Sequence, residues 1–120
     1  MSKTRDLEKK LDTLTSKVVL LRDDRCVTCN SPYNLECGHY YSRTWRGTRW
    51  DLDNCHAQCH KCNQRHELDS KPYDLWFVDN YSTNELIEIG QKAFCTRKIG
   101  YSEMLLIYEE LKEEEKKYGR

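Results

Sequence analysis

The sequence predicts an α+β fold in which a small β unit lies between an N-terminal helix and several C-terminal helices. Apolar residues recur at helical spacing near both ends of the chain. That period disappears between two Cys-x-x-Cys pairs, where aromatic and β-branched stretches alternate with turn residues. No Pro- or Ser-rich linker divides the chain. We therefore expect a single domain with an N-terminal helix (1–25), a cysteine-bounded core (26–68) and a helical C-terminal part (69–120).

The segment from about residue 3 to 24 is predicted to form an amphipathic helix, because it lacks Gly and Pro and carries one apolar stripe. The stripe consists of Leu7, Leu11, Leu14, Val18 and Leu21. It covers few heptads, so a helix docked on the core is favoured over a coiled coil. A homodimer contact through this helix is the alternative.

Start signals place the later helices. Pro72 suits the first turn of a helix, and Ser82 with Glu85 has the spacing of a capping box. Ser102 is expected to start the last helix, which ends in a charged, solvated tail.

Composition limits the function classes. The 120 residues carry 20 basic and 20 acidic side chains, which excludes a globally basic nucleic-acid binder. Acidic residues outnumber basic ones only after residue 66, so a polyanion surface is expected in the first half. No apolar signal segment follows Met1, and no apolar run approaches the ~18 residues of a membrane span. We expect a cytoplasmic protein without membrane contact.

Four cysteines have the spacing of a closed metal site. Two x2 turns can point four thiolates at one Zn²⁺, which would fold the protein without taking part in chemistry. The expected ligands of this structural zinc are Cys26, Cys29, Cys59 and Cys62. The remaining thiols, expected to be small and partly buried, are Cys37, Cys55 and Cys95.

Two strands, near 35–41 and 50–58, fit the space between the cysteine pairs. Strand alternation puts His39 on one face of the first strand together with Leu35 and Cys37, and it puts Asn54 on one face of the second. Asn63 follows on a helix. A ββα unit is therefore predicted to bring His39, Asn54 and Asn63 to a common point.

The order GHYYSR … RWDLDNCHAQCHKCN resembles the HNH (ββα-metal) nucleases, and within them the phage NinG/Rap recombination endonucleases. The likeness covers about residues 26–66, and it is looser in the helix after Pro72. It implies an HNH-like core and a metal-dependent endonuclease acting on branched recombination DNA such as Holliday junctions or D-loops. It also implies a phage or prophage protein working in a bacterial host cell.

The resemblance assigns roles residue by residue. His39 takes the place of the general base, Asn54 that of a residue that orients it through the backbone, and Asn63 that of a ligand for catalytic Mg²⁺ or Mn²⁺. A neutral imidazole can deprotonate water near neutral pH, and an amide oxygen suits Mg²⁺. Many HNH sites carry Asp where this chain has Gly38, so a further ligand is needed. The candidates, in order of preference, are His56, His66 and Glu36.

Structural roles for two of these histidines stay open. His56 fits equally well as a strand histidine with a backbone partner. His66 fits somewhat better as a helix-surface residue than as a metal ligand.

The stretch YYSRTWRGTRW interleaves arginines with aromatic rings. Arginines bind phosphates and rings stack on unpaired bases, so this stretch is predicted to contact DNA by shape. The residues concerned are Arg43, Arg46, Arg49, Tyr40, Tyr41, Trp45 and Trp50. The alternative is a hairpin whose aromatic rings pack inside the protein.

Two other functions compete with the enzyme. The first is a non-catalytic zinc-binding module that binds DNA as a recombination accessory protein, with catalysis lost at Gly38. The second is an adaptor whose terminal helices recruit a host or phage recombination protein.

Overall fold

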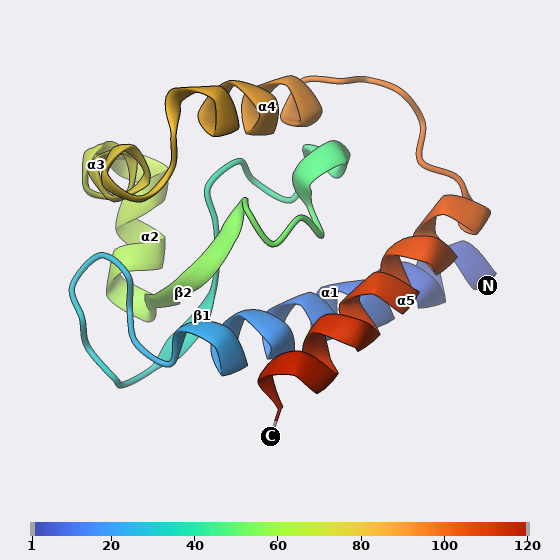
Figure 1. Cartoon of the computed structure of the whole chain (residues 1–120), viewed down its shortest axis with the longest axis horizontal. Coiled ribbons are helices and arrows are strands. Elements are labelled where there is room, and N and C mark those ends of the chain that lie inside the picture. Colours follow the sequence, from blue (N-terminus) through green and yellow to red (C-terminus); the bar gives the residue numbers. More distant parts are fainter. Residues whose placement is uncertain (1, 120) are drawn as a thin grey trace.

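A two-stranded antiparallel sheet lies in the middle of the fold, with helices on both of its faces (Figure 1). The computed structural model describes residues 2–119. Its elements are α1 (Lys3–Asp23), β1 (Leu35–His39), the 3-10 turn η1 (Arg46–Thr48), β2 (Cys55–Cys59), α2 (His60–Leu68), α3 (Lys71–Asn80), α4 (Thr83–Ala93) and α5 (Tyr101–Tyr118). The predicted mixture of helices and a small sheet is therefore confirmed.

The first and last helices run side by side and in the same direction (Figure 1). Lys3 lies over the ring of Tyr101 near their starts, and Lys17 Nζ lies 2.7 Å from Glu115 Oε2 near their ends. The apolar stripe of α1 is buried in this contact, and the participating residues are Leu7, Leu11, Leu14, Val18, Trp50, Met104 and Leu111. The docked interpretation of the N-terminal helix is confirmed, and most of the stripe is covered within the chain.

The strand register decides which side chains share a face. His39 pairs with Cys55 and Cys37 pairs with Ala57, and α1 covers this face through Val19. Gly38 pairs with His56 on the opposite face, which α2 covers and which α3 reaches through Tyr73. The second strand begins at residue 55 rather than 50, because the segment before it forms turns closed by backbone bonds.

The outer edge of β2 is also occupied. Asp23 at the end of α1 accepts a hydrogen bond from the backbone N–H of Ala57 at 2.9 Å, and Val27 donates to the carbonyl of Ala57 at 2.9 Å. Such contacts protect a short edge strand from pairing with other chains.

An aromatic cluster joins α3 and α4 to the sheet, with Tyr73, Phe77 and Ile89 buried at its centre. Pro72 lies in the first turn of α3, and Ser82 and Glu85 form the predicted capping box of α4. The last helix begins at Tyr101, one residue before the predicted start.

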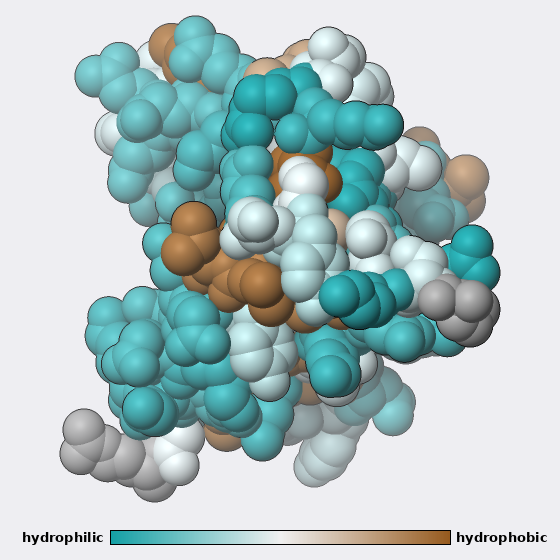
Figure 2. All heavy atoms as spheres, turned by 90° about the vertical axis from the view of Figure 1, so that its right-hand side faces the viewer, coloured by the Kyte–Doolittle hydropathy of each residue, from teal (hydrophilic) through white to brown (hydrophobic). Residues whose placement is uncertain are grey.

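Figure 2 shows the molecule from the right-hand side of Figure 1. Hydrophilic side chains dominate this face, and an apolar patch lies near its centre. Among the described residues, no helix is both long and apolar enough to cross a membrane.

Candidate functional site

The four predicted zinc ligands lie together. Their sulfur atoms are all within 4.8 Å of one another, and the Sγ atoms of Cys29 and Cys59 are 3.7 Å apart. A tetrahedron with Zn–S bonds of about 2.3 Å has edges of about 3.8 Å, so the cluster fits one zinc ion. Cys26 and Cys29 come from the turn after α1, Cys59 ends β2, and Cys62 lies in the first turn of α2.

Local contacts shift the pKa values of the cluster thiols in opposite directions. Burial alone would raise the pKa of Cys26, but the Thr28 hydroxyl and backbone N–H groups lower it to about 6. Burial and neighbouring thiols raise the pKa of Cys62 to about 12. A cation that holds all four as thiolates must therefore offset their mutual repulsion, which is what bound zinc does.

His39 is half-buried and fixed by the backbone. Its Nε2 lies 2.8 Å from the carbonyl oxygen of Arg49. A carbonyl only accepts hydrogen bonds, so Nε2 carries the hydrogen and the lone pair of the neutral ring is on Nδ1. Burial lowers the pKa of His39 from 6.5, although the bond to Arg49 opposes this. Among the described residues, none forms a hydrogen bond with Nδ1.

Asn54 is fully buried and fastens the loop between the strands. Its Oδ1 accepts from the backbone N–H of Tyr41 at 2.9 Å, and its Nδ2 donates to the carbonyls of Tyr41 and Thr48, both at 3.0 Å. Thr48 directly precedes Arg49, whose carbonyl contacts His39. Asn54 is therefore connected to His39 through the backbone.

Asn63 lies beside Glu36, the least preferred of the three predicted extra metal ligands. Its Nδ2 donates to Glu36 Oε1 at 2.7 Å, and Glu36 Oε2 lies 2.9 Å from His60 Nδ1. The bond from Asn63 and the nearby His60 lower the pKa of Glu36. Sequence reasoning missed His60, although its position directly after β2 was a usable signal.

The predicted meeting of His39 with Asn63 does not occur. His39 points to the α1 face of the sheet, while α2 carries Asn63 along the opposite face. Gly38 lies on the α2 face, and a Cβ there would be 2.2 Å from Gln58 Oε1. Gln58 thus fills the space that an acidic side chain at position 38 would need.

The two histidines preferred as extra ligands have other partners. His56 is in the aromatic cluster, where Nδ1 is 3.2 Å from the Tyr73 hydroxyl and Nε2 is 2.7 Å from the Tyr81 hydroxyl. Neither nitrogen is left for a metal, so the alternative of a structural strand histidine fits, with tyrosines as partners. His66 Nε2 lies 2.8 Å from the carbonyl of Tyr40. Its Nδ1 is buried without a described partner, and the residue lines a cavity of about 50 Å³.

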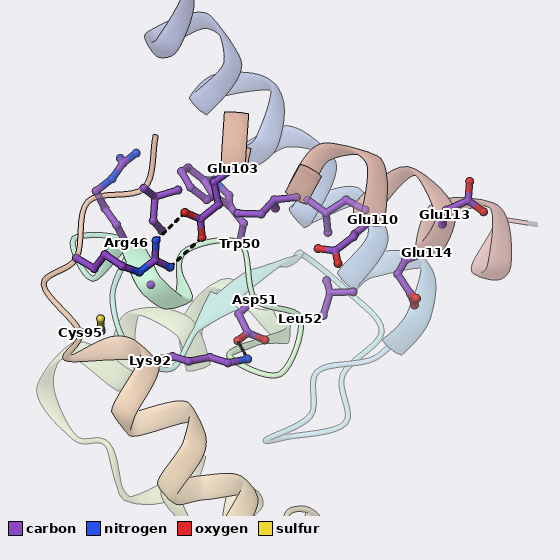
Figure 3. Close-up of a pocket in the computed structure, with 15 residues that line it drawn as sticks. Arg46, Trp50, Asp51, Leu52, Lys92, Cys95, Glu103, Glu110, Glu113 and Glu114 are labelled. Atoms are coloured by element: carbon purple, nitrogen blue, oxygen red, sulfur yellow. Dashed lines mark hydrogen bonds and ion pairs between the residues drawn. The ribbon is translucent and has the colours of Figure 1, made fainter. Parts of the chain in front are cut away.

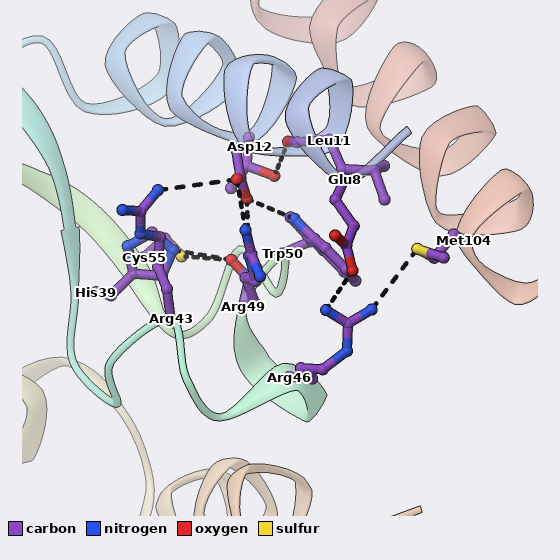
Figure 4. A network of polar contacts seen from close by, with 11 residues as sticks. Glu8, Leu11, Asp12, His39, Arg43, Arg46, Arg49, Trp50, Cys55 and Met104 are labelled. Carbon is purple, nitrogen blue, oxygen red and sulfur yellow. Dashed lines mark hydrogen bonds and ion pairs between the residues drawn. The ribbon is translucent and has the colours of Figure 1, made fainter. Parts of the chain in front are cut away.

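The arginine-rich loop makes most of its contacts inside the protein (Figure 4). Arg49 forms a paired hydrogen bond with Asp12 of α1, at 3.0 and 2.7 Å, and the Trp50 indole donates to the same carboxylate at 2.8 Å. Arg46 lies 2.6 Å from Glu8 of α1. These contacts anchor the loop to α1.

The other predicted DNA contacts divide into two groups. Tyr40 and Tyr41 pack against the aromatic cluster. Arg43 is the most exposed arginine of the loop, with 63% of its side chain exposed although its Nη1 lies 3.8 Å from Asp12 Oδ2, and Trp45 is 41% exposed against Phe94. Arg43 and Trp45 are thus the two members of the set best placed to meet a ligand.

A cavity of about 650 Å³ lies between η1 and α5, and Arg46 and Trp50 of the arginine-rich loop border it (Figure 3). Trp50, Leu52 and Leu111 contribute apolar surface, while Glu110 and Glu114 contribute negative charge. His39, Asn54 and Asn63 do not border it. Because carboxylates repel phosphates, we do not assign DNA to this cavity.

These features define the class as a small α+β protein whose cysteine cluster can bind zinc. The whole chain, residues 1–120, matches the family described as Bacteriophage Lambda NinG protein, and the protein belongs to this NinG family. Comparisons with curated proteins and with solved structures gave no match.

Removing one cluster thiol tests the zinc site. We expect Cys62→Ser to lower bound zinc and to abolish cooperative thermal unfolding, because structural zinc contributes about 10 kcal/mol of folding free energy. Zinc content and circular dichroism melts measure this. Cys95→Ser is the control, since Cys95 is exposed and outside the cluster. A Cys62→Ser protein that melts like the control would rule out a structural metal.

Asp12 gives a stability prediction with a pH signature. Burial raises its pKa, but hydrogen bonds from Arg49 and Trp50 outweigh this and lower the pKa below 3.8. A lowered carboxyl pKa stabilises the fold above about pH 4, and the effect is lost as pH falls through the folded-state value.

We expect Asp12→Asn to reduce the free energy of unfolding by about 2 kcal/mol at pH 7, and the deficit to shrink below pH 4. Urea titrations at pH 7 and pH 3 measure both. Asp79→Asn is the control, because Asp79 is exposed. Equal urea midpoints for the two variants at pH 7 would contradict the proposed role of Asp12.

Proposed function

We propose that this protein is a metal-dependent, structure-specific DNA endonuclease of the HNH type that hydrolyses phosphodiester bonds with His39 as general base. The observation that carries the proposal is the hydrogen bond from His39 Nε2 to the Arg49 carbonyl, which leaves the Nδ1 lone pair for a proton. The order of β1, β2 and α2, held at one end by the cysteine cluster, supports the HNH-like part.

In the proposed reaction, a water molecule gives a proton to His39 Nδ1 while its oxygen attacks the phosphorus, and the bond to the 3′ oxygen breaks. Asn54 is a positioning residue in this scheme. It holds Thr48, and therefore the adjacent Arg49 carbonyl, where His39 donates its hydrogen bond.

Catalytic Mg²⁺ or Mn²⁺ is best accommodated by Glu36 with Asn63 and His60. The carboxylate provides the hard oxygen that these ions prefer, and the Asn63 amide oxygen is not used in its bond to Glu36. When bound, such an ion would stabilise the negative charge on the phosphate and on the leaving oxygen.

The proposed substrate is branched recombination DNA such as Holliday junctions or D-loops, because the family likeness suggests it and the exposed loop residues suit it. Arg43 can bind a phosphate close to His39, and Trp45 can stack on an unpaired base. Paired nicks need two active sites, which a homodimer or two separate copies would supply. The proposed setting is the cytoplasm of a bacterial host, with a host or phage recombination protein as partner.

A second function is favoured by the opposed positions of His39 and Asn63. Two groups on different faces of a sheet do not readily act on one phosphate, and Gly38 supplies no carboxylate. The alternative is therefore a non-catalytic zinc-binding protein that binds branched DNA as a recombination accessory.

Substitution of His39 discriminates the two functions. We expect His39→Ala to reduce cleavage of a labelled four-way junction by about 10²–10⁴-fold in Mg²⁺ or Mn²⁺, with DNA binding retained. Fork, single-stranded and linear duplex DNA complete the substrate panel, and EDTA should abolish cleavage by the wild type.

Tyr33→Ala is the control, because Tyr33 is 73% exposed in a loop before β1. Zinc content and melting temperature establish that each variant is folded, and His39→Gln serves if the alanine variant is unstable. Junction binding without cleavage by the wild type would reject the enzyme in favour of the accessory protein.

Arg43 and Arg49 give a paired prediction for DNA contact. Arg43→Gln should weaken junction binding and reduce the slope of log affinity against log salt by about one. It should change stability little, because the 3.8 Å contact of Arg43 with Asp12 is long and mostly exposed. Arg49→Gln should instead lower stability, because it breaks the contact with Asp12. Fluorescence anisotropy across a salt series and urea titrations measure these effects. Unchanged binding by Arg43→Gln would remove this residue from the DNA surface.

A further inference from the structure

Three metal-binding side chains lie together outside the four-cysteine cluster. Cys37, His39 and Cys55 each offer one ligand atom, and these atoms are all within 4.8 Å of one another. The strand register brings them together, because His39 is directly opposite Cys55 and Cys37 is two residues before His39 on the same face. The two thiols are in different strands and belong to neither Cys-x-x-Cys pair.

We propose that Cys37, His39 and Cys55 form a second metal site that takes a thiophilic divalent ion such as Zn²⁺ and that, when occupied, removes His39 from proton transfer. Two thiolates and one imidazole bind Zn²⁺ better than they bind Mg²⁺. Three protein ligands leave the fourth position of a tetrahedral ion to water. The half-buried Cys37 and His39 provide the open side of the site, and the buried Cys55 provides its floor.

The charge of the occupied site suits its half-buried position. Binding releases the two thiol protons, so the pair of sulfur atoms and the ion together carry no net charge. Val19 covers this face of the sheet and limits exchange with water. The guanidinium group of Arg22, paired with Asp23, donates to the backbone carbonyl of Cys55 at 2.6 Å and fixes this end of β2.

Metal binding at this site has a direct chemical consequence for His39. The neutral imidazole has one lone pair and one N–H, so a ring that binds a metal through one nitrogen keeps hydrogen on the other. No lone pair then remains to accept a proton from water. This inhibitory part rests on the proposed function, whereas the metal site itself does not.

Cobalt provides the test. The full chain, purified with its structural zinc and kept reduced, is titrated with Co²⁺, whose thiolate complexes absorb visible light. We expect one further equivalent of Co²⁺ to bind the wild type with a tetrahedral, thiolate-ligated spectrum. Cys37→Ser should lose this signal at unchanged zinc content, while Cys95→Ser should retain it, because Cys95 is exposed and belongs to neither group of metal-binding side chains.

Cys37→Ala provides a second variant if serine disturbs the fold. Absence of the signal in the wild type, or a signal in Cys37→Ser and Cys37→Ala as strong as that of the wild type, would overturn the metal site.

Cleavage assays then test the inhibitory part. Micromolar Zn²⁺ added to Mg²⁺ or Mn²⁺ reactions should slow the wild type at least tenfold and leave Cys37→Ser largely active. Equal inhibition of both proteins would reject the link to His39 even if cobalt binds. Absence of cleavage without added zinc would reject the proposed function alone, and the cobalt spectra would still decide the metal site.

Discussion

Closure of the four-cysteine cluster is the constraint on which the rest of the structure depends. It joins the turn after α1, the end of β2 and the start of α2 at one point. Two strands of five residues are too short to be stable alone in water, so the hairpin needs such a support. The register of the hairpin then decides that His39 faces α1 and that Glu36 faces α2. By supporting the hairpin, the cysteine cluster therefore sets the positions of His39 and Glu36.

The arginines of the loop between the strands have two different roles: some anchor the loop to α1, and one is accessible to a ligand. The loop's alternating arginines and aromatic rings are the pattern expected of a nucleic-acid surface, yet Arg46 and Arg49 bind carboxylates of α1. Arg43 alone among the three arginines is mostly exposed. The acidic partners lie more than thirty residues away in sequence, so inspection of the loop could not separate anchoring arginines from accessible ones.

Local signals in the sequence were sufficient for much of the fold. The helical stripe of α1, Pro72 in α3 and the capping box of α4 are each determined by neighbours a few residues apart, and all were predicted. The cysteine cluster was predictable because spacing alone brings each pair together. The placement of Glu36 beside Asn63 was not, because it depends on how α2 lies along β1. Likewise, the sequence left His56 open between a metal ligand and a structural histidine, because its tyrosine partners lie within and just after a later helix, α3.

The parallel pairing of α1 with α5 has a consequence for biosynthesis. The contacts that bury the stripe of α1 join residues nearly the full chain length apart, as Lys17 and Glu115 illustrate. During translation, α1 emerges long before its partner, and its leucines stay uncovered until α5 has been made. Contacts of such high sequence separation form slowly and leave apolar surface open to association in the meantime. The nascent chain of this protein therefore exposes the leucines of α1 until α5 has left the ribosome.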